Sequence, residues 1–180
     1  MASLRITGGN LRGRRVPVPP EQTRPTSERA RQAFFNIVGD RIEGARFLDL
    51  FAGSGVFSFE AVSRGASSST AIDQDRKAMS TVTTLAAEWS VNVEAMAADV
   101  ERALSRLPGT YDIVYADPPY SFARYDRLVE AISSCVKPSP ESMVAIEHRR
   151  RSEPFKAGDG PLKPGRTAEY GEVWITFFQT

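Results

Sequence analysis

The sequence predicts an α/β fold, in which a mainly parallel sheet carries helices on both faces and follows a small N-terminal extension. From Arg46 onward, short apolar segments rich in β-formers alternate with segments of helical periodicity. The first apolar segment runs into a glycine-rich turn, Gly53–Gly55, which is typical of a strand–helix unit. The chain has 180 residues, which suits one domain with a short appendage.

The N-terminal segment "SLRITGGNLRGRRVPVP" alternates β-formers with arginines around Gly8–Asn10, which predicts a hairpin. After the irregular run "PPEQTRP", residues 26–40 have the pattern of a helix, with a cap at Thr26 or Ser27. Phe34 and Phe35 are expected in its core-facing side. We divide the chain into a basic hairpin extension, 1–22, and a larger domain, 23–180.

The remaining elements follow in alternation, and the last strand is expected at the edge of the sheet, where it can pair antiparallel with its neighbour. The Pro/Gly-rich segment before that strand is interpreted as a loop. Strands are expected at 46–51, 69–73, 91–99, 111–117, 142–148 and 171–179, and helices at 55–65, 75–89, 100–107 and 125–136.

Composition excludes several classes of function. Cys135 is the only cysteine, so the chain has no internal disulfide and no cysteine-rich metal site, and we expect this side chain in the core. His148 is the only histidine, and we expect it to be exposed and predict no metal site. No apolar run reaches the roughly 18 residues of a membrane span, and the N-terminus has no apolar signal core, so we expect a cytoplasmic protein that does not enter a membrane.

Charge is distributed unevenly along the chain. Met1–Asn36 contains seven arginines and two glutamates, a net charge of +5, so the rest of the chain sums to −4. Arginines clustered at one end favour an anionic partner, most simply a nucleic acid, although a solvated basic terminus has the same composition.

The glycine turn carries the first functional signal. Glycines between a strand and its helix let a ligand approach the backbone, and Asp73 stands at the end of the second strand, where an acid accepts bonds from ribose hydroxyls. Ser58 occupies the position where a dinucleotide fingerprint has Gly or Ala, which argues against hydride transfer with NAD. The pattern predicts a ligand that contains a nucleoside.

Asp99 follows the third strand of the domain. It can accept a bond from an exocyclic amine such as adenine N6, or it can cap the helix at 100–107. The two roles are compatible, and the sequence leaves both open.

The tetrad Asp117-Pro118-Pro119-Tyr120 ends the fourth strand, at the edge of the sheet where ligands bind. An amine attached to a base is a poor nucleophile, because its lone pair is delocalised into the ring. A carboxylate and a fixed backbone carbonyl that accept its two N–H groups can direct that lone pair toward an electrophile, and a tyrosine can stack on the base. The tetrad therefore predicts chemistry on an exocyclic amine rather than a simple proline turn.

Together, "FLDLFAGSG", Asp73, Asp99 and "DPPY" resemble S-adenosylmethionine-dependent methyltransferases that modify exocyclic amines. The segments "RITGGNLRGRRVPVP", "TRPTSERARQAFFNIV" and "FAGSGVFSFEAVSRGA" narrow the resemblance to the RsmD family of 16S ribosomal RNA guanine-N2 methyltransferases. The resemblance covers nearly the whole chain. It implies a Rossmann-like class I methyltransferase fold, with a seven-stranded, mainly parallel sheet and an antiparallel last strand.

The resemblance also implies a cofactor, a substrate and site residues. S-adenosylmethionine would bind at Asp49, Phe51, Ala52, Gly53, Ser54, Gly55, Asp73, Gln74, Asp99 and Val100. A flipped-out guanine, number 966 of the 16S rRNA, would be methylated in the small ribosomal subunit by Asp117, Pro118, Pro119 and Tyr120. RNA would be held by Arg5, Arg12, Arg14, Arg15, Arg24, Thr26, Arg29 and Arg31. Phe122, Arg124 and Tyr125 could form a lid over the base, and we expect a monomer.

Two other hypotheses stay open at this point. One is a DNA adenine-N6 methyltransferase, which commonly carries an added recognition region for which this chain is short. The other is a non-catalytic RNA-binding protein that retains a nucleotide site. The chain departs from the usual family pattern at Asp73, where glutamate is more common, and at Gln32, where an acid is common.

Overall fold

The computed structural model describes residues 2–18, 28–119, 121–137, 139–149, 155 and 160–180. Their elements form a two-stranded and a seven-stranded sheet, with helices around the larger one. In chain order the elements are β1 (Ser3–Arg5), β2 (Arg15–Pro17), α1 (Glu28–Val38), the 3-10 helix η1 (Gly39–Ile42), β3 (Arg46–Leu50), α2 (Val56–Ser63), β4 (Ser68–Asp73), α3 (Arg76–Trp89), β5 (Val93–Ala97), α4 (Val100–Leu104), β6 (Ile113–Ala116), α5 (Tyr125–Ser133), β7 (Met143–His148), β8 (Lys163–Tyr170) and β9 (Val173–Gln179).

The large sheet has the order β5-β4-β3-β6-β7-β9-β8. The first five strands in this order are parallel, and β9 is antiparallel to both β7 and β8. The predicted α/β class, the seven strands and the antiparallel last strand are therefore confirmed. After β3 the chain moves outward to β4 and β5, and then returns to place β6 on the other side of β3. This reversal is the point in open α/β sheets at which ligands bind.

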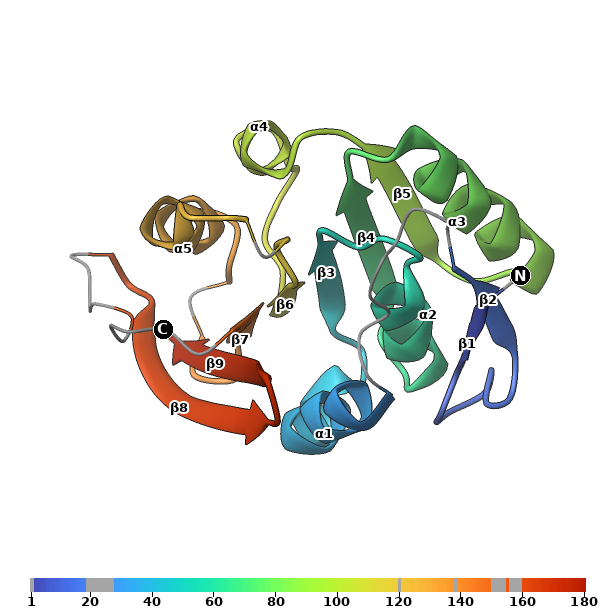
Figure 1. Cartoon of the computed structure of the whole chain (residues 1–180), viewed down its shortest axis with the longest axis horizontal. Coiled ribbons are helices and arrows are strands. Elements are labelled where there is room, and N and C mark those ends of the chain that lie inside the picture. Colours follow the sequence, from blue (N-terminus) through green and yellow to red (C-terminus); the bar gives the residue numbers. More distant parts are fainter. Residues whose placement is uncertain (1, 19–27, 120, 138, 150–154, 156–159) are drawn as a thin grey trace.

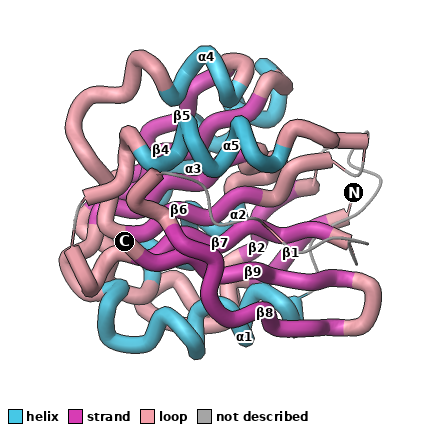
Figure 2. Tube along the Cα trace, turned by 90° about the vertical axis from the view of Figure 1, so that its left-hand side faces the viewer, coloured by secondary structure: helices cyan, strands magenta, loops and turns pink. Residues whose placement is uncertain are grey.

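Helices cover both faces of this sheet (Figure 1). One buried cluster lies under α1, α2 and α3 and includes Phe34 and Phe35, as expected, and another lies under α4 and α5 and includes Cys135. Figure 2 shows the strands between α4 and α5 on one side and α1 on the other. Because both faces are covered, β6 and β7 are buried at every position, which explains their nearly continuous apolar sequences.

The prediction of a loop before the last strand is wrong, because Lys163–Tyr170 forms the edge strand β8. The last strand, β9, therefore lies between β7 and β8 and not at the edge, as was expected. Only Ala168 in it is buried, so the alternation that reveals a strand is missing. Its Pro164 and Gly165 look like loop residues, but an edge strand tolerates proline because one side of its backbone has no partner strand. The register shifts between Pro164 and Thr167 at this point.

The predicted N-terminal hairpin is present, with β1 and β2 antiparallel. Ile6, Leu11 and Val16 belong to the same buried cluster as the residues of α1 and α2, so the hairpin packs on the main body. The division at residues 22 and 23, and the caps Thr26 and Ser27, lie outside the described residues. In the part of the chain that is described, no helix combines the length and the apolar character of a membrane span.

Candidate active site

A strained turn joins β3 to α2 at the point where the sheet reverses. Phe51, Gly53 and Gly55 all have positive φ, of 59°, 51° and 73°. A Cβ on Gly55 would also lie 2.7 Å from Cγ2 of Val82, so both conformation and space require glycine there. Phe51 has no such freedom, and a non-glycine residue in this conformation is typical of functional turns.

Asp73 holds the glycine turn from the end of β4. Its Oδ2 accepts a bond of 2.9 Å from the Gly53 N–H, and its Oδ1 accepts one of 2.9 Å from the Asp75 N–H. A carboxylate has about four acceptor positions, so this half-buried side chain keeps capacity for the hydroxyls of a ligand. Binding of a ribose by Asp73 stays a prediction.

Asp49 lies beneath the turn and is 2% exposed. Its Oδ2 accepts hydrogen bonds from the N–H of Ser58, at 3.0 Å, and from its hydroxyl, at 2.9 Å. Burial raises the pKa of this carboxyl from 3.8 to about 7, against the opposing effect of the two bonds from Ser58. The sequence marked Ser58 only as a departure from a dinucleotide pattern, whereas the structure shows that it ties α2 to β3.

Ser54 has the one buried hydroxyl of the turn, and it has no hydrogen-bond partner among the described residues. The side chain is 3% exposed. A buried hydroxyl without a partner costs free energy, and the cost is recovered if a bound polar group supplies the missing bond. The turn therefore fits a ligand with polar atoms close to the backbone.

The other predicted cofactor residues lie at the same edge of the sheet. Asp99 caps α4, since its Oδ1 accepts a 3.0 Å bond from the Arg102 N–H, so the cap that the sequence left open is confirmed. Its side chain is exposed, Gln74 is exposed, Ala52 is half-buried and Val100 is buried.

The corner after β6 lies directly beside the glycine turn. Leu50 of β3 pairs with Ala116 of β6, and the N–H of Asp117 donates to the carbonyl of Leu50 at 3.2 Å. Asp117 is half-buried and Pro119 is exposed, so the corner is accessible rather than sealed in the core. Pro118 is buried, and no described residue donates a hydrogen bond to its carbonyl. Tyr120 lies outside the described residues.

The segment after the Asp117 corner contacts the glycine turn and α4, and it leads directly into α5. The carbonyl of Pro119 accepts a 2.8 Å bond from the Phe122 N–H, which closes a tight turn. The ring of Phe122 meets that of Phe51 at 5.5 Å between centroids, and Arg124 forms a 3.2 Å ion pair with Glu101 of α4. The lid predicted at Phe122, Arg124 and Tyr125 therefore lies next to the corner, and its motion stays a prediction.

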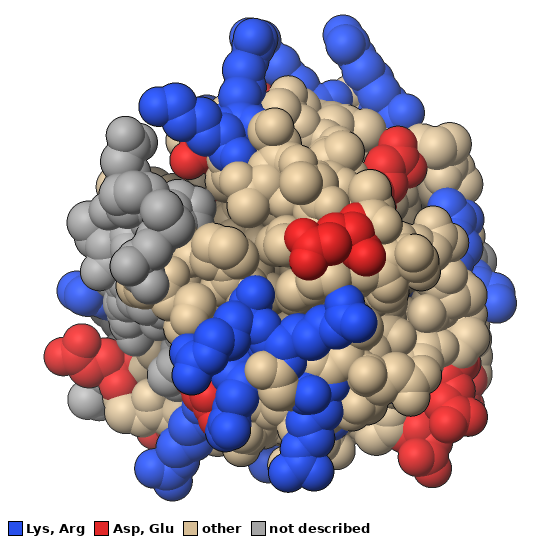
Figure 3. Space-filling view, turned by 90° about the vertical axis from the view of Figure 1, so that its right-hand side faces the viewer, with Lys and Arg blue, Asp and Glu red and all other residues tan. Residues whose placement is uncertain are grey.

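Most of the arginines predicted to bind RNA are exposed. Figure 3 looks at the side of the molecule that carries the hairpin, and it shows Lys and Arg side chains gathered there. Arg24 and Thr26 lie outside the described residues. The exposed arginines of the predicted set are Arg5, Arg12, Arg14, Arg15 and Arg29.

The prediction for Arg31 is wrong. Its side chain is completely buried, where Nη2 donates to the carbonyl of Arg5 at 2.7 Å and Nε lies 3.4 Å from Oε2 of Glu60. Burial lowers the pKa of this guanidinium, an effect that Glu60 opposes. Arg29 and Arg31 lie on different faces of α1. The face with Arg29 is exposed to solvent, whereas the face with Arg31 points into the protein.

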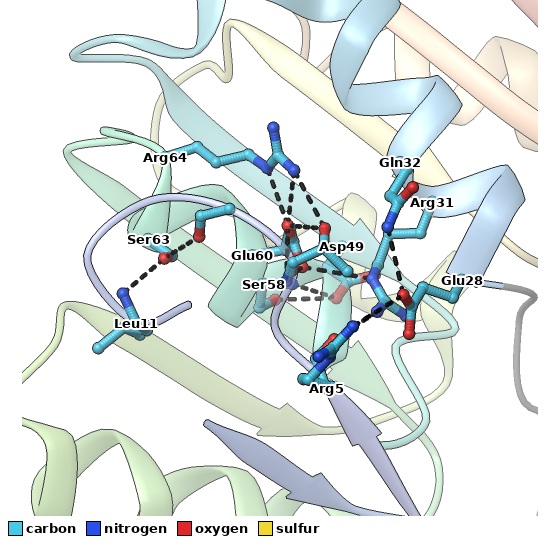
Figure 4. A network of polar contacts seen from close by, with 12 residues as sticks. Arg5, Leu11, Glu28, Arg31, Gln32, Asp49, Ser58, Glu60, Ser63 and Arg64 are labelled. Atoms are coloured by element: carbon cyan, nitrogen blue, oxygen red, sulfur yellow. Dashed lines mark hydrogen bonds and ion pairs between the residues drawn. The ribbon is translucent and has the colours of Figure 1, made fainter. Parts of the chain in front are cut away.

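Glu60 is the residue that the sequence analysis missed. Its buried carboxylate accepts bonds from the Thr7 hydroxyl, at 2.5 Å, and from the Thr7 N–H, at 2.9 Å. It also pairs with Arg64 at 2.9 Å, as Figure 4 shows. It thus connects the hairpin, α1 and α2. The spacing of Glu60 and Arg64, one helical turn apart, was the one available signal.

His148 is buried and not exposed, so that expectation is also wrong. Its Nε2 lies 2.8 Å from Oγ1 of Thr176, and its Nδ1 lies 2.7 Å from the carbonyl oxygen of Arg149. The residue stands at the end of β7, next to β9, and the sequence did not predict that this neighbouring strand would cover it.

The strand order and the residues that it brings to the ends of β3, β4, β5 and β6 define a class I methyltransferase fold. The family model described as "Conserved hypothetical protein 95" matches residues 4–179, and the chain belongs to this family, the RsmD family.

Curated relatives and solved structures agree with this assignment. The chain is 31% identical to the candidate rRNA methyltransferase YlbH of Bacillus subtilis, over 98% of each chain. It is 32% identical to the ribosomal RNA small subunit methyltransferase D of Escherichia coli, over 80% of this chain and 74% of that one. The solved structure of the candidate methyltransferase yhhF of Escherichia coli superposes with a TM-score of 0.87 at 27% identity, over 99% and 98% of the two chains. The chain is therefore a methyltransferase.

Proposed function

We propose that the protein transfers a methyl group from S-adenosylmethionine to the exocyclic N2 amine of a guanine in small-subunit ribosomal RNA. The observation that carries this proposal is the accessible Asp117 corner directly beside the glycine turn. The names of its relatives, an rRNA methyltransferase and a small-subunit rRNA methyltransferase, support the class of substrate.

The residues of the turn fit the cofactor. The buried hydroxyl of Ser54 can bond the polar end of its methionine part, and Asp73 can accept bonds from ribose hydroxyls with the capacity that Gly53 and Asp75 leave. Asp99 and Val100 stand at the end of β5, where the adenine would lie. When bound, the cofactor supplies an electrophilic methyl group.

The corner residues act on the amine. Asp117 accepts one N–H of the guanine amine and the Pro118 carbonyl accepts the other, so that the nitrogen lone pair points toward the methyl group. The same two acceptors would stabilise the positive charge that develops on the nitrogen as the methyl–sulfur bond breaks and S-adenosylhomocysteine leaves. The nitrogen would then lose one proton through Asp117 to solvent. Alignment of the two reacting atoms supplies much of the remaining acceleration. Tyr120 would stack on the base.

The exposed hairpin arginines would bind phosphates and so bring the RNA strand to the site. We infer guanine 966 of the 16S rRNA as the target from the family that the chain belongs to. No described contact favours an adenine in DNA as an alternative substrate.

The test uses the Asp117→Ala variant with S-adenosylmethionine carrying a labelled methyl group. The substrate is small ribosomal subunits from a strain that lacks the gene. We expect transfer to fall at least a hundredfold, since the variant loses a group that acts on the developing charge, while calorimetry still detects cofactor binding.

Asp126→Ala is the matched control, because Asp126 is an exposed carboxylate beyond the corner. It should transfer the methyl group at the wild-type rate. If the Asp117→Ala variant transferred the methyl group at the wild-type rate, the proposed role of Asp117 would be wrong. If the wild-type protein transferred no methyl group to these subunits, the proposed substrate would be wrong.

A further inference from the structure

A row of aromatic rings runs along the edge of the sheet from the glycine turn to the antiparallel strands. We call it the aromatic row; it consists of Phe51, Phe122, Tyr125, His148 and Trp174. Successive ring centroids lie 5.5 Å, 5.3 Å, 6.3 Å and 6.4 Å apart. All four contacts are edge-to-face.

The strand register places this row beside the Asp117 corner. Ala116 of β6 pairs with Ile146 of β7, and Ile146 pairs with Thr176 of β9. Because β9 is antiparallel to β7, its first residues lie at the edge where β7 ends, and Trp174 pairs with His148. The row therefore extends from the proposed cofactor turn, past the corner, to the side away from β4 and β5.

One member of the row, His148, is buried and anchored, whereas the other four rings are half-buried. His148 is held by Thr176 and by the carbonyl of Arg149, and its ring meets that of Phe155 at 5.1 Å. Phe122, Tyr125 and Trp174 are half-buried. Trp174 is thus a large aromatic side chain, partly accessible to solvent, with its neighbour in the row fixed by hydrogen bonds.

Two exposed arginines belong to the segments that carry the row. Arg124 lies over the ring of Phe122, 5.8 Å from its centroid, and Arg149 follows His148 directly. Aromatic rings with arginines beside them are the usual surface for single-stranded nucleic acid, because every base has a face that can stack and every nucleotide carries a phosphate. An apolar peptide would not need the two cations.

We propose that the Trp174 end of the aromatic row is a stacking site for an unpaired base adjacent to the target guanine in the RNA strand. This inference rests on the proposed function, because continuity with the Asp117 corner identifies the occupant as the same strand. Arg124 and Arg149 would hold the phosphates on either side. The site would make the enzyme select an unpaired target region rather than a duplex.

Fluorescence of Trp174 tests this directly. The chain has two tryptophans, and the other, Trp89, packs on Phe59 and under Arg14 at the far side of the molecule. The Trp89→Phe variant leaves Trp174 as the one indole. Titration with a single-stranded RNA decamer should give a saturable loss of its fluorescence, because a stacked base quenches the ring.

A decamer of the same length with abasic riboses is the matched control, and it should bind without this loss. Equal quenching by both decamers, or none by either, would overturn the proposal, since the strand would then be held by its phosphates alone.

A second arm measures the affinity for the decamer. Stacking of one base contributes about 1–3 kcal/mol, so Trp174→Leu should bind roughly tenfold more weakly and Trp174→Phe within about threefold of wild type. Cofactor affinity should be unchanged in both variants. Unchanged RNA affinity in a folded Trp174→Leu protein would contradict the proposal while leaving methyl transfer, tested through Asp117, intact.

Discussion

Asp49 is an acid whose pKa the fold raises at the candidate site. It is buried beneath the glycine turn with two bonds from Ser58, and burial raises its pKa to about 7. The folded protein therefore binds more protons than the unfolded chain between pH 3.8 and about pH 7. It follows that this residue makes the free energy of unfolding fall as pH rises through that window, and that its effect is constant above it.

Asp49→Asn should remove this dependence. A pKa shift of one unit corresponds to about 1.4 kcal/mol. Between pH 4 and pH 8 the free energy of unfolding of the wild-type protein should therefore fall by up to about 4 kcal/mol more than that of the variant. The measurement is the free energy of unfolding in urea at several pH values. Asp40→Asn is the control, because it replaces an exposed carboxylate. It should not change how the free energy of unfolding depends on pH. A slope shared by the wild-type protein and Asp49→Asn would show that Asp49 ionises normally.

The residue scale also shows where sequence reasoning ends. Asp73, Asp99 and Asp117 were found because each follows a strand, and the ends of parallel strands meet at one edge. Arg31 and His148 were misplaced because their burial depends on which distant elements cover them. Glu60 was missed for the same reason, since its partners Thr7 and Arg31 are brought to it by the tertiary fold.

At the scale of elements, the N-terminal hairpin is attached to the main body mainly by its contact with α2. The loop of the hairpin meets the end of α2, where Asn10 and Leu11 donate to the backbone carbonyl and the hydroxyl of Ser63, both at 2.8 Å. Farther along, Thr7 bonds the buried Glu60. Because α2 begins at the glycine turn and is tied to β3 by Asp49, the hairpin and the turn share one rigid support.

Gly9→Ala should break this contact. A Cβ on Gly9 would lie 1.6 Å from the carbonyl oxygen of Ser63, so the loop would have to leave α2. We expect a loss of stability of more than about 3 kcal/mol, from the clash and the lost bonds. The measurement is again the free energy of unfolding.

Gly13→Ala is the matched control for the backbone. Gly13 also has positive φ, of 91°, but nothing lies within 4 Å of the added Cβ. It should cost about 1–2 kcal/mol, from conformation alone. Equal losses in the two variants would show that the hairpin loop does not depend on contact with Ser63.

The elements themselves were predicted well where periodicity was clear. The first five parallel strands and their helices follow from alternation of buried apolar runs with helical patterns, and β9 from its aromatic and β-branched residues. β8 could not be predicted, because an exposed edge strand has neither an apolar face nor a need to avoid proline and glycine.

At the scale of the whole molecule, the basic N-terminal part of the sequence forms a surface rich in exposed arginines. The exposed arginines belong to the hairpin and, in the case of Arg29, to α1, whereas the aromatic row and the Asp117 corner lie along the edge of the sheet. An RNA substrate would then contact two regions. Phosphate binding at the hairpin would supply affinity, and the edge of the sheet would read the base.

Replacement of Arg12, Arg14 and Arg15 by glutamine should weaken RNA binding and lower its dependence on salt. Each phosphate contact contributes about 0.7–0.9 to the slope of log affinity against log salt, so the slope should fall by roughly two to three. Arg106→Gln, which changes an exposed arginine just after α4, should leave this slope unchanged. A slope unaffected by the triple change would mean that the hairpin does not contact the RNA.

The most direct test of the central claim is the identity of the methylated nucleoside. Small ribosomal subunits from a strain without the gene are incubated with the protein and S-adenosylmethionine, and the RNA is digested and analysed by mass spectrometry. We predict N2-methylguanosine at a single position of the small-subunit rRNA, mapped to guanine 966. Methyl groups on adenine N6, on a ring carbon or ring nitrogen, or on ribose would contradict an account in which Asp117 and the Pro118 carbonyl hold the amine of a guanine.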